Sequence, residues 1–414
     1  MDELSSQEIN NIPMSFNEVK SIIQSGDYLK LKEIIESGRI KDINMKEDRN
    51  KGISLLHLAC FSGNIDMVRL IIESGFIISD RVLLTLFKCT DIIVNCDIVN
   101  VICEYIVDVN YEEHTYKSFL GYACMAGNVE LTRLLLERGA IVDLSTLRAA
   151  CMMELTEIVR LLLTCNKTSH KLSKRSVSVP LKCSSRYGHL AIVRYLVEYG
   201  TDQQGLNGAL YEAIDHDHRD VTEYLLDNGA IFSSQTNQTC NELIWACHRG
   251  ASDVVDLLLA RGTDPNTVDS RGESALHAAL YCPVILNTFF EHGADPNVYL
   301  KDGSTVLLEL TRYSNGSLTE TLTILLQSGL VDVNLPHAHT GETALMIAAL
   351  AQHIEYVKLL LHYGADVTQV NSDGKSVIDQ LNGQEGKAEG YTEVIKLCTQ
   401  YIKTNKPTTG PILK

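Results

Sequence analysis

Apolar residues recur along this chain in short helical stripes, and most of these stripes end at a glycine. The residues before the glycines read alike, for example LLLERG, YLLDNG, LLLARG and LLLHYG. Aliphatic residues spaced three and four apart give a helix one apolar face, and a following glycine favours the left-handed conformation in which many helices end. The pattern therefore predicts a series of amphipathic helices. Their glycine stops are Gly38, Gly75, Gly139, Gly200, Gly229, Gly262, Gly293, Gly329 and Gly364.

The glycine stops recur at a nearly constant interval. Adjacent stops lie roughly 29 to 37 residues apart, except for two wide gaps that each hold a degenerate copy, at 99–106 and at 159–166. In the second copy Asn166 replaces the glycine, and asparagine also tolerates the left-handed conformation. A period of ~33 residues is typical of a solenoid, here of about twelve units, in which each unit must stack on its neighbours to bury its apolar face.

Each unit also contains an upstream helix with a pair of small residues. It is marked by LHLAC at 56–60, LHAA at 276–279 and LMIAA at 345–349. Small side chains allow neighbouring helices to approach closely, and a glycine turn then leads into the second helix. In the best-marked unit we expect helices over 274–280 and 284–291. The pattern therefore predicts helix-turn-helix units and an all-α chain.

These residues resemble the ankyrin repeat, whose usual form is D-x-x-G-x-T-P-L-H-x-A-A-x-x-G-H-x-x-V-V-x-L-L-L-x-x-G-A-D-P-N. Units 264–297 and 341–366 match it closely. The resemblance implies an all-α ankyrin-repeat solenoid of about twelve helix-turn-helix units with finger loops. It also implies that the finger tips and first helices line a concave face. His57 and His277 occupy the histidine position of the motif, where we expect hydrogen bonds between adjacent repeats.

The resemblance covers nearly the whole chain and sets its expected organisation. Residues 1–14 are a polar lead-in, residues 15–403 form the repeat array with atypical first and last units as caps, and residues 404–414 read as a disordered tail. The apolar segment 79–106 is a drifted repeat, with a groove for a partner as the alternative. The basic segment 166–175 is an exposed finger, with a nuclear import signal as the alternative.

Composition narrows the choice of compartment and partner. The net charge of −16 argues against nonspecific nucleic-acid binding and favours a protein partner with a basic patch. The twelve cysteines fall mostly at small helix positions, which indicates reduced, buried thiols. There is no secretory signal pattern, and no apolar run reaches the ~18–20 residues of a membrane helix. We therefore expect a monomer in the cytoplasm, with the nucleus as the alternative.

No residue pattern predicts a catalytic or metal site. His216 and His218 lie at a turn, and His337 and His339 at a finger, where metal binding is the less favoured interpretation. The glycine-rich segment 382–387 lacks the spacing of a phosphate-binding loop. We therefore expect no cofactor, no metal and no enzyme activity.

The function that we expect is a non-catalytic scaffold that binds a partner protein on its concave face. The alternative is a targeting module, either a substrate adaptor or a host-directed effector. The resemblance assigns thirteen variable first-helix positions to the concave face: Leu58, Phe61, Tyr122, Met125, Arg186, Tyr187, Glu212, Trp245, His248, Arg249, Tyr281, Glu309 and Ile347.

Among these positions, aromatic and basic residues are the best candidates for partner contacts, because such side chains are enriched at binding hot spots. The chain's one tryptophan is among them. The predicted partner-binding residues, with one finger-tip arginine added, are Phe61, Tyr122, Arg186, Tyr187, Trp245, His248, Arg249, Arg271 and Tyr281.

One asparagine carries a modification signal. The segment 326–334 reads LQSGLVDVN, which resembles the site where an asparaginyl hydroxylase acts on ankyrin repeats. We expect Asn334 to serve the turn, with hydroxylation as the alternative.

Overall fold

In the described part of the chain the backbone is helical and contains no β-strand, so the predicted all-α class is confirmed. Three isolated bridges, such as the one between Val268 and Ser274, close the bases of finger loops. The computed structural model describes residues 13–46, 53–78, 96–105, 108–110, 118–164, 174–232, 241–313, 318–383 and 389–404.

The chain divides into two compact units, Met1–Ser184 with His189–Asp202, and Ser185–Gly188 with Gln203–Lys414. The helices up to residue 199 are α2 (Phe16–Ser25), α3 (Tyr28–Glu36), α4 (Leu55–Phe61), α5 (Ile65–Glu73), α8 (Cys96–Glu104), α9 (Phe119–Met125), α10 (Val129–Glu137), α11 (Leu144–Met152), α12 (Thr156–Thr164), α13 (Lys174–Arg186) and α14 (Leu190–Tyr199). The end of α13 belongs to the second unit.

The other helices of the second unit begin at residue 203. They are α15 (Gln203–Asp215), α16 (Arg219–Asp227), α17 (Glu242–Arg249), α18 (Ser252–Ala260), α19 (Ala275–Ala279), α20 (Pro283–Glu291), α21 (Val306–Tyr313), α22 (Thr319–Gln327), α23 (Ala344–Leu350), α24 (Ile354–His362), α25 (Val377–Asn382) and α26 (Glu389–Thr404).

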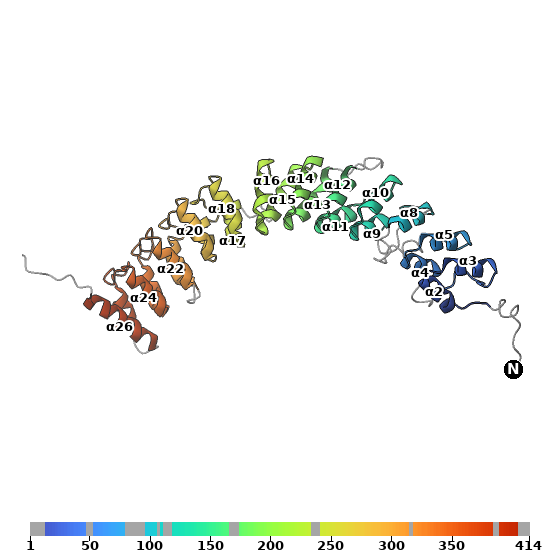
Figure 1. Ribbon diagram of the computed structural model, residues 1–414. Coiled ribbons are helices and arrows are strands. Elements are labelled where there is room, and N and C mark those ends of the chain that lie inside the picture. Colours follow the sequence, from blue (N-terminus) through green and yellow to red (C-terminus); the bar gives the residue numbers. More distant parts are fainter. Residues whose placement is uncertain are drawn as a thin grey trace, which may run out of the picture. The chain divides into compact units, whose positions relative to one another are not determined.

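Within the second unit the helices stack in sequence order as two rows (Figure 1). The first helices pack on one another in the pairs α15–α17, α17–α19, α21–α23 and α23–α25, and the second helices pack in an unbroken series from α16 to α26. The core lies between the rows and is built from the predicted apolar faces, including Leu258, Leu286 and Phe289. Stacking of near-identical pairs is the arrangement that the period predicts.

Local sequence explains where these helices begin and end. Ser274 is the N-cap of α19, and its hydroxyl accepts a hydrogen bond from the backbone N–H of His277. Pro283 occupies the first turn of α20, where its missing N–H costs nothing. The observed bounds of α19 and α20 therefore lie within one residue of those predicted.

Asparagine side chains at the base of one finger form hydrogen bonds with the backbone at the base of the next finger. Asn297 donates from Nδ2 to the carbonyl of Leu330 at 2.8 Å and accepts from the backbone N–H of Asp332 at 2.8 Å. Asn334 repeats both bonds with Gly364 and Asp366. The expected structural role of Asn334 in the turn is thus visible, and its hydroxylation stays a prediction.

Several sequence predictions fall outside the described residues. They concern most of the polar lead-in, the apolar segment before residue 96, the basic segment before residue 174 and all but the first residue of the predicted tail. The division into lead-in, array and tail, and the number of units, therefore stay predictions.

Candidate protein-binding surface

Helix α17 presents three of the predicted partner-binding residues on one side. Trp245, His248 and Arg249 are spaced at i, i+3 and i+4, so they share a helix face. The opposite face is buried and includes Leu243 and Cys247. His248 and Arg249 are exposed, whereas Trp245 is partly buried. We call the outer side chains of α15, α17, α19 and α21 in the second unit, with the finger at 269–273, the first-helix surface.

Trp245 belongs to an aromatic cluster. Its ring centroid lies 5.1 Å from that of Tyr211 on α15, and Tyr211 stacks in turn on Phe232 at 6.2 Å. The indole N–H of Trp245 is buried and has no hydrogen-bond partner in the described residues. The tryptophan therefore contributes to packing between repeats and also reaches the first-helix surface.

Ion pairs connect the charged residues of this surface. The Arg249 Nε atom lies 2.8 Å from Asp215 Oδ1, and His248 Nε2 lies 3.2 Å from Glu273 Oε1. Farther along the unit, Arg186 donates from Nε and Nη2 to the two carboxylate oxygens of Glu212, at 2.8 and 3.1 Å. The predicted basic residues are thus held in place by carboxylates from α15 and from the finger at 269–273.

The finger tip at Arg271 is organised by a buried aspartate. The Asp269 side chain is 1% exposed and accepts hydrogen bonds from the backbone N–H groups of Arg271 and Glu273 and from Arg271 Nε at 2.9 Å. Burial alone raises the pKa of Asp269, but these hydrogen bonds outweigh it and hold the pKa below its usual value. Arg271 Nη2 also donates to Glu273 at 3.0 Å.

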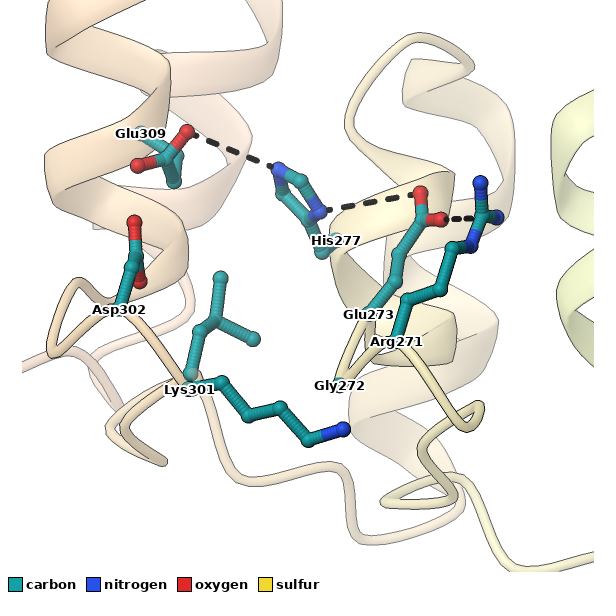
Figure 2. Close-up of a pocket in the computed structure, with 8 residues that line it drawn as sticks. Arg271, Gly272, Glu273, His277, Lys301, Asp302 and Glu309 are labelled. Atoms are coloured by element: carbon teal, nitrogen blue, oxygen red, sulfur yellow. Dashed lines mark hydrogen bonds and ion pairs between the residues drawn. The ribbon is translucent and has the colours of Figure 1, made fainter.

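A cavity of about 370 Å³ opens between this finger and the next one. His277 lies across it (Figure 2), with Nδ1 3.8 Å from Glu273 Oε1 and Nε2 4.0 Å from Glu309 Oε2. The cavity is lined by Arg271, Gly272, Glu273, His277, Leu300, Lys301, Asp302 and Glu309. Of these, only Arg271 was predicted from the sequence to contact a partner, although Glu309 was also expected on the concave face.

Among the described residues, the two motif histidines form no hydrogen bond between repeats. His57 accepts from the backbone N–H of Ser54, the N-cap of its own helix, and its buried Nε2 has no hydrogen-bond partner in the described part of the chain. His277 lies 4.0 Å from Glu309 of the next unit, which is too long for a hydrogen bond. For His277 the prediction was wrong, because the family pattern does not show which neighbours each ring nitrogen meets, and for His57 it stays a prediction because residues 79–95 of the following repeat lie outside the described residues.

The remaining predicted contact residues are distributed over both compact units. Tyr281 and Tyr187 are exposed in the second unit, and Phe61 is exposed in the first, where Tyr122 is partly buried. Three of the variable positions, Leu58, Glu309 and Ile347, are buried, and the two apolar ones belong to the core.

The described residues hold no group of three histidine, cysteine or acidic side chains that could bind a metal ion. The rings of His216 and His218 lie 6.4 Å apart, and Asp217 between them accepts a hydrogen bond from the backbone N–H of Val254. Cys124 is a free thiol, and burial raises its pKa to about 12. Such a thiol stays protonated and inert at neutral pH.

Comparison with known proteins assigns the family. Family models described as ankyrin repeats match residues 147–236 and 282–371 (three copies), 243–282 (many copies) and 51–79 (one repeat). Together these matches cover more than half of the chain. The chain belongs to the ankyrin-repeat family. Ankyrin repeats are a protein-interaction module. A membrane-spanning helix needs a long apolar stretch, and no helix in the described part of the chain has one.

Curated relatives share the ankyrin array and are longer. Ankyrin repeat domain-containing protein SAT10 of Stachybotrys chartarum is 32% identical over 45% of this chain and 9% of its own length. The probable E3 ubiquitin-protein ligase XBOS32 of Oryza sativa subsp. japonica is 28% identical over 49% of this chain and 41% of its own length. The chain thus spans less than half of either relative. The crystal structure of EF0377, an ankyrin repeat protein, matches 47% of this chain and 98% of its own with a TM-score of 0.40 and 26% identity.

Proposed function

We propose that this ankyrin-repeat protein is a non-catalytic scaffold that binds a partner protein on the concave face of its array. The observation that carries the proposal is the arrangement on α17, where a partly buried tryptophan lies beside exposed His248 and Arg249. Tryptophan and arginine are enriched at interface hot spots, and a tryptophan already fixed against Tyr211 loses little entropy on binding.

The charge of the chain supports a partner with a basic patch. The chain carries a net charge of −16, and carboxylates such as Asp215, Glu212 and Glu273 line the first-helix surface. A field of one sign raises the rate at which partners of the opposite sign arrive. The predicted contacts of Phe61, Tyr122, Arg186, Tyr187, Arg271 and Tyr281 belong to the same proposal.

Affinity capture from cells that contain the protein tests this proposal. The intact chain is compared with Trp245→Ala and Arg249→Ala, and the matched control is Lys358→Ala on the second helix α24, where the exposed Lys358 pairs with nearby Glu355. The two surface variants are expected to bind the captured partner at least about tenfold more weakly, while the control binds normally.

Unfolding measurements separate recognition from packing in the same variants. Trp245→Ala is expected to lose about 1 kcal/mol of stability with its Tyr211 contact and a further amount with the apolar area of its partly buried ring, and Arg249→Ala less, because exposed ion pairs contribute little. Collapse of the second unit in Trp245→Ala would identify Trp245 as a core residue and refute its role in recognition.

A second candidate is a substrate adaptor, or a host-directed effector, that acts through the same array. The similarity to a probable E3 ubiquitin-protein ligase over 41% of that protein favours the adaptor role. In that case the captured material contains an enzyme in addition to the substrate, and Trp245→Ala releases the substrate while the enzyme stays bound.

A further inference from the structure

The cavity beside His277 is lined by a buried carboxylate, one oxygen of which has no hydrogen-bond donor among the described residues. The Glu309 side chain on α21 is 8% exposed, and no described group donates a hydrogen bond to its Oε1 atom. The nearest cation is Arg312, whose Nη1 lies 3.8 Å from Oε1, beyond hydrogen-bond range. Burying a charged oxygen is costly unless donors reach it, so such a group in a native protein calls for a partner.

The cationic groups in the cavity wall already have partners. Arg271 is bonded to Asp269 and Glu273, and Lys301 donates from Nζ to the carbonyl of Ser270. Figure 2 shows Lys301 extending toward Gly272 and away from Glu309. Its methylenes lie over Gly272, where an added Cβ atom would be 2.4 Å from Lys301 Cγ. Arg271 is therefore held within its own finger, whereas Lys301 joins the two fingers.

We propose that this cavity accepts a lysine or arginine side chain of the partner protein, whose cationic end donates hydrogen bonds to Glu309. This inference rests on the proposed function and adds the chemistry of one contact. The cavity volume of about 370 Å³ is sufficient for one long side chain, and Glu273 and Asp302 add negative charge to its walls. The lining carries three carboxylates, and its two cations, Arg271 and Lys301, are already bonded to other groups, so the charge pattern favours a cationic guest over an anionic one.

The inference is tested with a library of short random peptides selected on the intact chain. Peptides that no longer bind Trp245→Ala are retained, because they bind the first-helix surface. We expect each to require one lysine or arginine, whose replacement by norleucine weakens binding at least about tenfold.

Glu309→Gln then links that peptide residue to the cavity, because glutamine keeps the shape of glutamate and removes its charge. It is expected to weaken binding of the basic peptide at least about tenfold and to leave binding of the norleucine peptide unchanged. This non-additivity is expected when the two substituted groups are in direct contact. The matched control is Glu355→Gln on α24, where the carboxylate is exposed. Thermal unfolding checks that each variant is folded. If Glu309→Gln does not fold, the comparison of the basic and norleucine peptides on the wild-type chain still tests whether a cation is required.

Two kinds of result would overturn the inference about the cavity, and only the second would also overturn the proposed binding surface. If the selected peptides need Trp245 but no basic residue, the cavity does not bind a cation. The same conclusion follows if Glu309→Gln and the norleucine replacement have additive effects on the binding free energy. In both cases the scaffold proposal stands. If no selected peptide depends on Trp245, the proposed binding surface fails together with the cavity.

Discussion

At the scale of single residues, His57 shows how burial sets the behaviour of one side chain. Its Nδ1 atom accepts from the backbone N–H of Ser54, its buried Nε2 atom has no partner among the described residues, and 2% of the residue is exposed. Burial, aided by nearby Lys46, lowers the pKa of His57 to about 4. The folded chain therefore keeps this ring neutral at pH values where the unfolded chain protonates it.

This pKa predicts that acid weakens the first unit. Between the unfolded pKa of about 6.5 and the folded pKa of about 4, the unfolded chain binds the extra proton, so stability falls as the pH falls. From pH 7 to pH 5 the loss is expected to be about 2 kcal/mol. Hydrogen-exchange protection of α4 measures it.

His57→Gln is the matched variant for this test. Glutamine at this position keeps a capping box with Ser54 but does not titrate. The variant is expected to lose about 2 kcal/mol less than the wild type between the two pH values. An equal pH dependence in both chains would assign the effect to other groups.

At the scale of elements, the fingers depend on close approach between consecutive loops. Gly341 adopts a φ of +67°, and an added Cβ atom would lie 2.8 Å from the backbone nitrogen of Ser372 in the next finger. Ser372 is held there because its N–H donates to the carbonyl of Thr340. The backbone of Ser372 cannot move aside as a flexible side chain can. Glycine is therefore required at position 341 both for the close approach of the next finger and for the positive φ.

Two glycine substitutions separate these requirements. Gly374 has a similar φ of +72° with open space around it, so Gly374→Ala is expected to cost only the left-handed strain of about 1–2 kcal/mol. Gly341→Ala is expected to cost more, because it also breaks the contact with the next finger. Denaturant unfolding of the two variants measures the difference, and equal costs would show that the approach at Ser372 relaxes freely.

At the scale of the whole molecule, stability is the sum of contacts between neighbouring repeats. Helix α20 packs against α18 on one side and α22 on the other within the row of second helices. A solenoid of this kind lacks one central core, so damage in one repeat spreads to its neighbours and declines with distance along the chain. The division into two compact units is consistent with such local cooperativity.

Leu286→Ala tests this local spread. Leu286 is 0% exposed, and its truncation is expected to cost about 2–5 kcal/mol. Hydrogen exchange is expected to speed up in α18, α20 and α22 while α4 and α5 keep their protection. Val284→Ala, in the same helix but at a side chain 75% exposed, is the control and should change little. Equal loss of protection throughout the chain would contradict the local model.

The sequence by itself determined the fold class and the position of most helices, because the signals involved are local. Apolar spacing, caps such as Ser274 and glycine stops act within a few residues, and they place α19 and α20 within one residue. The family pattern also placed Trp245, His248 and Arg249 on one helix face.

Only the tertiary structure decided which side chains meet across repeats. Leu58 and Ile347 occupy variable positions yet are buried, and the cavity of His277 joins Glu273 to Glu309 from units that the sequence describes separately. The physical reason is that such contacts depend on the spacing and rotation between stacked helices, which side chains throughout both repeats set together. The sequence period determines that the repeats stack, and the tertiary structure determines which residues are in contact.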